Sequence, residues 1–319
     1  MLNPFFRPKR NTRNWFVYSD VDCTPNETSD DNRKMKKLLL FGATGNLGKE
    51  VAKTAKQQGY DLTVVVRNKS KTGQLTSITD RFIVADITKR NQLTDICNGF
   101  DIVISTLGKS VSPNETSRQS FNDIDLIANS NILEEAKKSG VKKFVYVSAF
   151  HCEKYLHLEY FRVHHEFSER LKASGVNYSI IKPPAMFSAF LDMIEMAKRG
   201  LLSNIGKGDK RTNPIYEGDL ANECVNSIKD DNVTKEIGGR SIYTRRQLNK
   251  IIQEEVCPEK NVKNIPLWLF KFSLPVLKVI KKNMYDKFAF FAAVMQEDTI
   301  APQVGQMKFE DYIKMKRKI

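Results

Sequence analysis

Residues 38–48 read Leu-Leu-Leu-Phe-Gly-Ala-Thr-Gly-Asn-Leu-Gly, a short apolar run that ends in three glycines with two residues between each pair. The run is too short for a buried helix, so it predicts a buried strand that turns directly into a helix. Gly42, Gly45 and Gly48 lack Cβ atoms where a tight turn and an approaching pyrophosphate would be crowded. A glycine triplet alone also fits a plain surface turn. The strand before it and the helical pattern of residues 49–59 after it favour a dinucleotide or nucleotide site.

The composition fits one large α/β domain with an added lobe. The chain has 319 residues, 41% hydrophobic and 28% charged, and no apolar run approaches the roughly 20 residues that span a bilayer. Its net charge of +14 attracts anionic partners, but the basic residues are scattered, so we do not expect nucleic-acid binding. Five widely spaced cysteines without a Cys-x-x-Cys pair predict reduced thiols in a cytoplasmic protein rather than a disulfide framework or a zinc site.

The chain beyond the glycines alternates between strand and helix patterns. We expect strands at 38–41, 61–66, 81–86, 101–106, 143–148 and 178–182, and helices at 49–58, 91–97, 123–139, 158–173, 192–199 and 219–229. This order predicts a doubly wound parallel sheet of the Rossmann type, whose ligands lie beyond the carboxyl ends of the strands. We therefore divide the chain into a flexible tail at 1–34, a nucleotide-binding core at 35–185, and a substrate-facing lobe with C-terminal helices at 186–319.

Five segments together carry a resemblance to a known family. They are Gly-Ala-Thr-Gly-Asn-Leu-Gly at 42–48, Val-Ala-Asp-Ile-Thr at 84–88, Phe-Val-Tyr-Val-Ser-Ala at 144–149, Leu-Lys-Ala-Ser-Gly-Val-Asn-Tyr-Ser-Ile-Ile-Lys-Pro at 171–183, and Asn-Pro-Ile-Tyr-Glu-Gly-Asp-Leu-Ala at 213–221. Over about residues 36–255 the chain resembles the atypical short-chain dehydrogenase/reductase superfamily, in its NmrA-like NAD(P)-binding branch. The resemblance implies a Rossmann-type site and, in catalytic members, hydride transfer involving a carbonyl or an activated double bond.

The cofactor residues are expected at the ends of the first four strands. Basic residues follow the second strand, namely Arg67, Lys69 and Lys71, and a guanidinium matches a 2′-phosphate, so NADP is favoured over NAD. A solvated basic turn is the alternative, and it fits Lys71 better than Arg67. The resemblance implies that Asp86 binds the adenine amino group, although a helix cap is also compatible. The remaining expected cofactor residues are Gly42, Thr44, Gly45, Asn46, Leu47 and Gly48 in the turn, and Ser105, Thr106 and Leu107 near the ribose and nicotinamide.

The resemblance also implies three catalytic positions, Ser148, Tyr160 and His164. Tyr160 and His164 lie four residues apart and share one helix face. Catalytic members of the superfamily have a lysine where this chain has His164, and that lysine lowers the pKa of the tyrosine hydroxyl. A packed tyrosine, a turn serine and half-buried histidines are the alternative. All four histidines lie between residues 151 and 165, but no carboxylate or cysteine array accompanies them, so we do not expect a metal site.

Two functions remain open from the sequence. The first is an NADP-dependent reductase that acts on a small, partly apolar substrate. The alternative is a non-catalytic redox sensor or scaffold of the NmrA kind, which binds the dinucleotide and presents its C-terminal lobe to a protein partner. Residues 265–295 combine aromatic side chains with lysines, which would suit helices on a membrane surface. Pro266 and Pro275 split this segment, so a helical core or lid is favoured.

Overall fold

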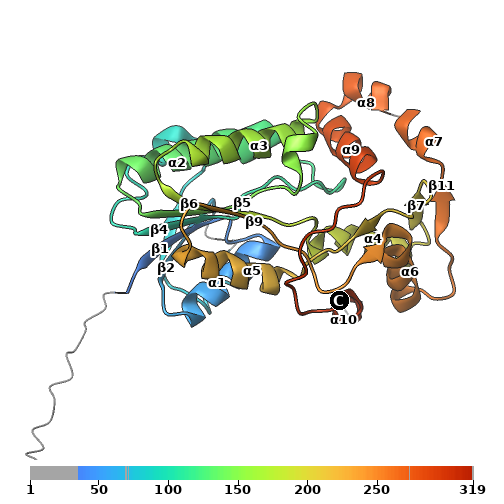
Figure 1. The fold of residues 1–319 in the computed structure, drawn as a ribbon, viewed down its shortest axis with the longest axis horizontal. Coiled ribbons are helices and arrows are strands. Elements are labelled where there is room, and N and C mark those ends of the chain that lie inside the picture. The colour runs from blue at the N-terminus through green and yellow to red at the C-terminus, as the bar shows by residue number, and fades with distance from the viewer. Residues whose placement is uncertain (1–34, 69, 71, 273, 318–319) are drawn as a thin grey trace, which may run out of the picture. The chain divides into compact units, whose positions relative to one another are not determined.

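A seven-stranded parallel sheet forms the centre of the molecule, with the strand order β3-β2-β1-β4-β5-β6-β9 (Figure 1). The computed structural model describes residues 35–317 except 69, 71 and 273, so the expectations for residues 1–34 and for Lys69 and Lys71 lie outside the described residues. The strands are β1 (Lys37–Phe41), β2 (Asp61–Val66), β3 (Phe82–Val84), β4 (Ile102–Ser105), β5 (Lys143–Val147), β6 (Asn177–Lys182) and β9 (Val233–Glu236). The first six follow the Rossmann order, which confirms the predicted doubly wound fold.

Helices cover both faces of the sheet (Figure 1). One face carries α1 (Asn46–Gln57) and α5 (Glu217–Asn226), and the other carries α2 (Asn129–Lys138) and α3 (Glu159–Lys172). The strands of a sheet covered on both faces must be apolar on both, and in β1 every residue from Leu38 to Phe41 is buried. The α1 helix buries small side chains such as Ala52 and Ala55, which lets it lie close to the sheet and to α5.

Two predicted helices differ in the structure. Residues 91–97 do not form a helix, because a single 3₁₀ turn at Arg90–Gln92 is followed by turns in which Asp95 has a left-handed φ of 60°. The helix expected at 123–139 begins as a wide π turn, Asn122–Ala128, and continues as α2. The side-chain amide of Asn129 donates to the carbonyl oxygens of Ile124 and Asp125 at 3.3 and 3.1 Å. These bonds help to hold the wide turn, which contains the buried Asp125.

The second half of the chain builds a lobe and also returns to the sheet. The lobe contains α4 (Leu191–Lys198), β7 (Ser203–Ile205), β8 (Arg211–Thr212), β10 (Tyr243–Thr244), α6 (Arg245–Val256), β11 (Lys263–Ile265) and α10 (Phe309–Lys316). It has its own apolar cluster around Phe187, Leu248 and Phe309. However, α5 and β9 pack into the sheet layers, so the expected boundary at residue 185 is crossed again by the chain.

Three further helices follow the lobe strands: α7 (Leu267–Phe272), α8 (Leu274–Ile280) and α9 (Lys282–Val294). The α9 helix buries Asp286, Lys287, Ala289 and Ala292, whereas α7 and α8 bury none of their described side chains. The expectation of a helical core at 265–295 therefore fits α9 but does not fit α7 and α8, and the alternative of a lid stays a prediction.

The described cysteines are buried free thiols. They are Cys97, Cys152, Cys224 and Cys257, while Cys23 lies outside the described residues. Burial raises the pKa of Cys97 and of Cys224 to about 12, so both thiols stay protonated at neutral pH.

Candidate functional site

The glycine turn, residues 42–48, connects β1 to α1. Gly42 has a left-handed φ of 83°, and its carbonyl oxygen accepts the Gly45 amide at 3.0 Å. A Cβ atom on Gly48 would lie 2.1 Å from that same oxygen, so only glycine lets the helix begin this close to the strand. Leu47 anchors the start of α1 in the apolar core.

The exposed part of the glycine turn fits a pyrophosphate. Thr44, Gly45 and Asn46 are exposed, and the first turn of α1 contains no acidic residue. The first amides of a helix have no intrahelical acceptor and carry the positive end of the helix dipole. An anion can therefore bind here without repulsion from a neighbouring carboxylate.

The carboxyl ends of β1, β4 and β5 meet beside the glycine turn. Phe41 is in register with Ser105, and Ser105 with Tyr146. The amide and the hydroxyl of Thr106 both donate to the Phe41 carbonyl oxygen, at 3.1 and 3.0 Å, which holds Thr106 against Gly42. Thr106 thus lies beside the turn as expected.

The two residues that flank Thr106 differ in what they can contact. Ser105 is buried, and its hydroxyl donates to the Asn129 side-chain oxygen at 2.5 Å, so it stabilises the sheet–helix packing. Leu107 is half-buried beside the site. Of the three residues expected near the ribose and nicotinamide, only Thr106 and Leu107 therefore have solvent-accessible surface that a ligand could contact.

Arg67 and Asp86 follow the ends of β2 and β3. Arg67 is exposed. One Asp86 carboxylate oxygen accepts both the amide and the hydroxyl of Thr88, at 3.1 and 2.7 Å. Burial alone would raise the pKa of Asp86, but these bonds and the charges of Arg67 and Lys89 hold it below 3.8. Asp86 is therefore ionised and caps a local turn, and its other oxygen has no hydrogen-bond donor among the described residues.

His164 belongs to a buried network with Asp125 and Tyr146. The Tyr146 hydroxyl lies 2.7 Å from Nδ1 of His164, and Nε2 of His164 lies 3.3 Å from an Asp125 carboxylate oxygen. Asp125 also accepts the Lys109 backbone amide at 3.2 Å. Burial lowers the pKa of His164 to about 3 and raises the pKa of Asp125 to about 8. Thus no imidazolium is present beside Tyr160 at neutral pH.

Tyr160 lies on α3 one turn before His164, with ring centroids 4.8 Å apart. Its ring also contacts Phe121 and Phe290, at centroid distances of 5.3 and 4.5 Å. Its hydroxyl has no hydrogen-bond partner within the described residues. Burial, and then the nearby Asp125, raise the pKa of Tyr160 above its ordinary value of 10, so this hydroxyl stays protonated at neutral pH.

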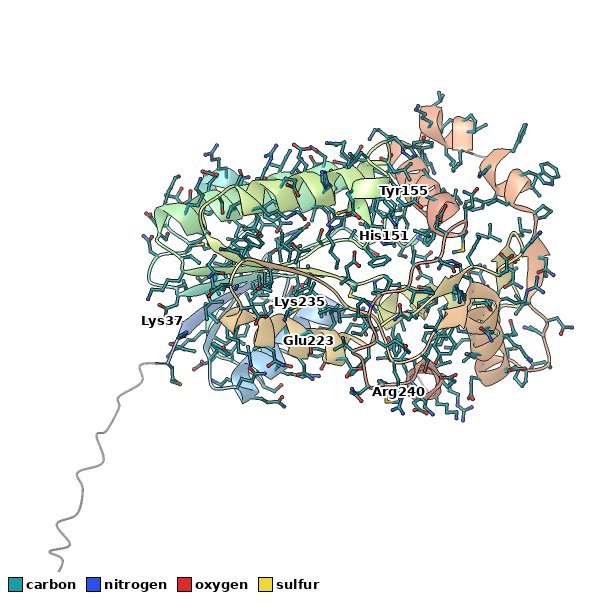
Figure 2. The ribbon with its side chains drawn as sticks, in the orientation of Figure 1. Lys37, His151, Tyr155, Glu223, Lys235 and Arg240 are labelled. Atoms are coloured by element: carbon teal, nitrogen blue, oxygen red, sulfur yellow. The ribbon has the colours of Figure 1, made fainter. Side chains whose placement is uncertain are left out.

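Tyr160 faces a small cavity of about 30 Å³ between α3, α9 and the segments that follow β5 and β6. The lining is largely aromatic, with a few polar groups: Ala149, Phe150, His151, Tyr155, Tyr160, Phe161, Pro183, Pro184, Phe290, Val294, Glu297 and Thr299. His151 and Tyr155 lie near each other in the part of the fold beside α9 (Figure 2). The lining is mostly apolar, but a volume of about 30 Å³ is about that of one water molecule, whereas small-molecule pockets span roughly 300–1,000 Å³.

Ser148 does not line this cavity. It is buried at the end of β5, where its hydroxyl lies 3.1 Å from the Ser168 hydroxyl on α3. Of the three expected catalytic residues, the structure therefore brings only Tyr160 to the cavity. The catalytic roles of all three residues stay predictions.

The sequence did not reveal the residues that surround His164 and Tyr160. Asp125 lies inside the predicted helix at 123–139, and only the wide turn at its start brings the carboxylate toward His164. Tyr146 lies two residues before Ser148, so strand alternation could have placed both on one face of the sheet. His151, one of the four histidines for which the sequence suggests half-buried positions, lines the cavity and has a left-handed φ of 54°.

The fold and this site define a Rossmann-type dinucleotide-binding protein. The sequence profile of the NAD(P)H-binding family matches residues 42–231, and the chain belongs to that family. This confirms the expected NAD(P)-binding family. The narrower assignment to the NmrA-like branch of the atypical short-chain dehydrogenase/reductase superfamily stays a prediction.

Similar proteins include both reductases and assembly factors. The photosystem II assembly factor Ycf39 of Cyanophora paradoxa is 28% identical over 48% of this chain, which spans 47% of that protein. The chloroplastic divinyl chlorophyllide a 8-vinyl-reductase of Cucumis sativus is 27% identical over 93% of this chain and 78% of its own length. The NADPH complex of the quinone oxidoreductase QOR2 from Escherichia coli has a TM-score of 0.66 at 19% identity, covering 87% of this chain and 99% of that one.

Proposed function

We propose that this protein is an NADPH-dependent reductase that transfers hydride to a carbonyl or an activated double bond of a small, partly apolar substrate. The observation that carries the proposal is Tyr160, whose side chain lines an aromatic cavity beyond the carboxyl ends of the strands and whose hydroxyl has no hydrogen-bond partner among the described residues. The relatives named as reductases support it. NADPH, when bound, supplies the hydride, and the protein supplies binding, orientation and a proton.

The glycine turn and the residues after β2 and β3 would hold the cofactor. The amide of exposed Asn46, at the start of α1, is suited to the pyrophosphate, whereas the Gly45 amide already donates to the Gly42 carbonyl oxygen. The Asp86 oxygen that has no donor among the described residues is suited to the adenine amino group. Arg67 is suited to the 2′-phosphate, because its guanidinium can donate two parallel hydrogen bonds to it. Arg67 lies close enough to Asp86 to lower the pKa of that carboxyl, which keeps both groups at one end of the site. This arrangement favours NADP over NAD.

Tyr160 is the proton donor in this proposal. As hydride arrives at a carbonyl carbon, the carbonyl oxygen gains negative charge and takes the Tyr160 proton. Since the pKa of Tyr160 is raised, the hydroxyl is protonated in the resting enzyme, which is the form that reduction needs. The Tyr160 hydroxyl is, however, a weaker acid than the corresponding tyrosine in family members with a lysine, because neutral His164 does not stabilise the phenolate that proton transfer leaves behind. Ser148 would orient the carbonyl oxygen only after releasing Ser168.

The alternative is a non-catalytic sensor or scaffold that binds the dinucleotide and presents its lobe to a protein partner. One observation favours it: the residue in the lysine position, His164, is neutral and buried, its Nδ1 is hydrogen-bonded to the Tyr146 hydroxyl, and its Nε2 lies 3.3 Å from an Asp125 carboxylate oxygen. The relative named as an assembly factor is compatible with this function.

NADPH oxidation with a panel of aldehydes, ketones and quinones tests the proposal. Tyr160→Phe should lower kcat by at least about 100-fold and leave the Kd for NADPH unchanged, because the lost proton transfer belongs to the chemical step. Tyr178→Phe is the matched control, since Tyr178 lies on β6 and does not line the cavity. Tight NADPH binding without turnover for any acceptor would reject the reductase and favour the sensor. Equal rates for Tyr160→Phe and wild type would remove Tyr160 from the mechanism.

A further inference from the structure

The α7 and α8 helices carry the most exposed large apolar side chains in the described part of the chain. The exposed fractions are 69% for Trp268, 76% for Phe272, 87% for Val279 and 69% for Ile280. Figure 1 shows both helices at the edge of the molecule, beyond α9. We call their surface the α7–α8 face. Apolar residues that gather on neighbouring short helices in this way mark an interaction surface.

The α7–α8 face is also cationic. Residues 260–285 contain lysines at positions 260, 263, 271, 278, 281 and 282, and neither aspartate nor glutamate. Lys271 donates to the Gln296 side-chain oxygen at 2.8 Å, and the ammonium of Lys278 lies 5.6 Å from the centroid of the Tyr285 ring. Both partners are uncharged, so these two lysines keep a net positive charge beside the apolar side chains. Lys282 differs, because it pairs with Asp286 and Glu159.

The geometry points to contact at a membrane surface. No helix among the described residues is long and apolar enough to cross a bilayer, and α7 and α8 contain only six and seven residues. Short helices with exposed aromatic residues and adjacent lysines can bury the apolar side chains at the level of the lipid headgroups. The lysine ammonium groups then remain near the phosphates of anionic lipids.

We propose that the α7–α8 face is a docking surface for an anionic lipid membrane. Charge decides between this occupant and a second copy of the chain, because a symmetric contact would bring two lysine-rich faces together without a carboxylate between them. An anionic bilayer instead has negatively charged headgroups that attract the lysines, and below them an apolar layer that can bury the exposed apolar side chains. This inference does not depend on the proposed reductase activity.

Sedimentation of the full chain with lipid vesicles tests the proposal. Binding to phosphatidylcholine vesicles with about 30% phosphatidylglycerol should exceed binding to phosphatidylcholine alone by at least about tenfold. The double variant Trp268→Ser/Phe272→Ser should reduce binding to the anionic vesicles about tenfold or more, because both side chains lose their apolar burial. Lys278→Gln/Lys281→Gln should remove most of the preference for anionic lipid. Met315→Ser, which removes an exposed apolar side chain on α10, is the control and should bind like wild type.

Tryptophan fluorescence gives a second, independent measurement. The chain contains two tryptophans, Trp15 and Trp268, so a Trp15→Phe background leaves Trp268 as the only reporter. Anionic vesicles should shift its emission to the blue, and brominated lipid should quench it. The proposal is overturned if neither vesicle binds, if the double variants bind like wild type, or if the emission of Trp268 does not change. Self-association that disappears in the Trp268/Phe272 variant, without vesicle binding, would assign the face to a second copy instead.

Discussion

Alanine substitutions in the glycine turn should separate folding from cofactor binding. A Cβ on Gly48 would lie 2.1 Å from the Gly42 oxygen, 1.3 Å short of the 3.4 Å at which ordinary contact begins. All three of its nearest atoms belong to the backbone of Gly42 and Ala43, so the start of α1 must move. The overpacking costs about 1–3 kcal/mol, and the better helix propensity of alanine offsets less than about 1 kcal/mol of it. Gly48→Ala should thus lower the Tm by several degrees and also weaken NADPH binding.

Gly45→Ala should instead weaken binding while the fold is preserved. Gly45 has a φ of −74°, which alanine adopts freely, and its Cβ would meet the Gly42 oxygen at 3.4 Å. The unfolding free energy should change by less than about 1 kcal/mol. The new methyl group would, however, occupy the surface where the pyrophosphate approaches, so the Kd for NADPH should rise at least about tenfold.

Thermal unfolding and calorimetric titration with NADPH would measure both effects in each variant. Gly73→Ala is the matched control, because no atom lies within 4 Å of its added Cβ, and both quantities should stay at the wild-type level. A wild-type Tm for Gly48→Ala would refute the close approach of α1 to Gly42. A wild-type Kd for Gly45→Ala would show that the pyrophosphate does not bind at this turn.

Three further predictions concern Arg67 and the buried network. Arg67→Gln should raise the Kd for NADPH by about 10–100-fold and leave the Kd for NADH nearly unchanged, because only NADPH has the 2′-phosphate; equal effects on both would reject this contact. Tyr146→Phe should lower the unfolding free energy by about 1–3 kcal/mol in urea titrations, since Nδ1 of His164 loses its buried partner, and a neutral result would contradict that bond. Because burial raises the pKa of Asp125 from 3.8 to about 8, its stabilising contribution is present at low pH and is lost as the pH rises through 8. The wild-type unfolding free energy should therefore fall by about 1 kcal/mol between about pH 7 and 8, and Asp125→Asn should abolish this slope; an unchanged slope would exclude Asp125 as its source.

Local patterns in the sequence predicted the sheet and the cofactor turn. All six expected strands lie within two residues of the observed ones at each end, because apolar, β-branched runs between turn residues suit a sheet that is buried on both faces. The helix expected at 91–97 does not form, because only one 3₁₀ turn, Arg90–Gln92, is present there and Asp95 takes a left-handed conformation that no periodicity reveals. Of the cofactor residues, Ser105 was expected near the ribose, whereas its hydroxyl is used by Asn129 inside the packing.

The sequence by itself determined the glycine turn at residues 42–48 and predicted that it binds a dinucleotide, because the need for glycine arises from backbone atoms only a few residues apart. Only the tertiary structure decided how His164 and Tyr160 are used. His164 meets Asp125 and Tyr146, which come from two other elements, and their burial keeps the imidazole neutral. Packing also decided that α9 closes the cavity while α7 and α8 stay exposed, since all three segments have similar apolar and basic composition. The spacing of residues along a helix or strand determines which side chains share one face of that element. Which other elements pack against the face, however, determines how exposed its side chains are and which of them are charged.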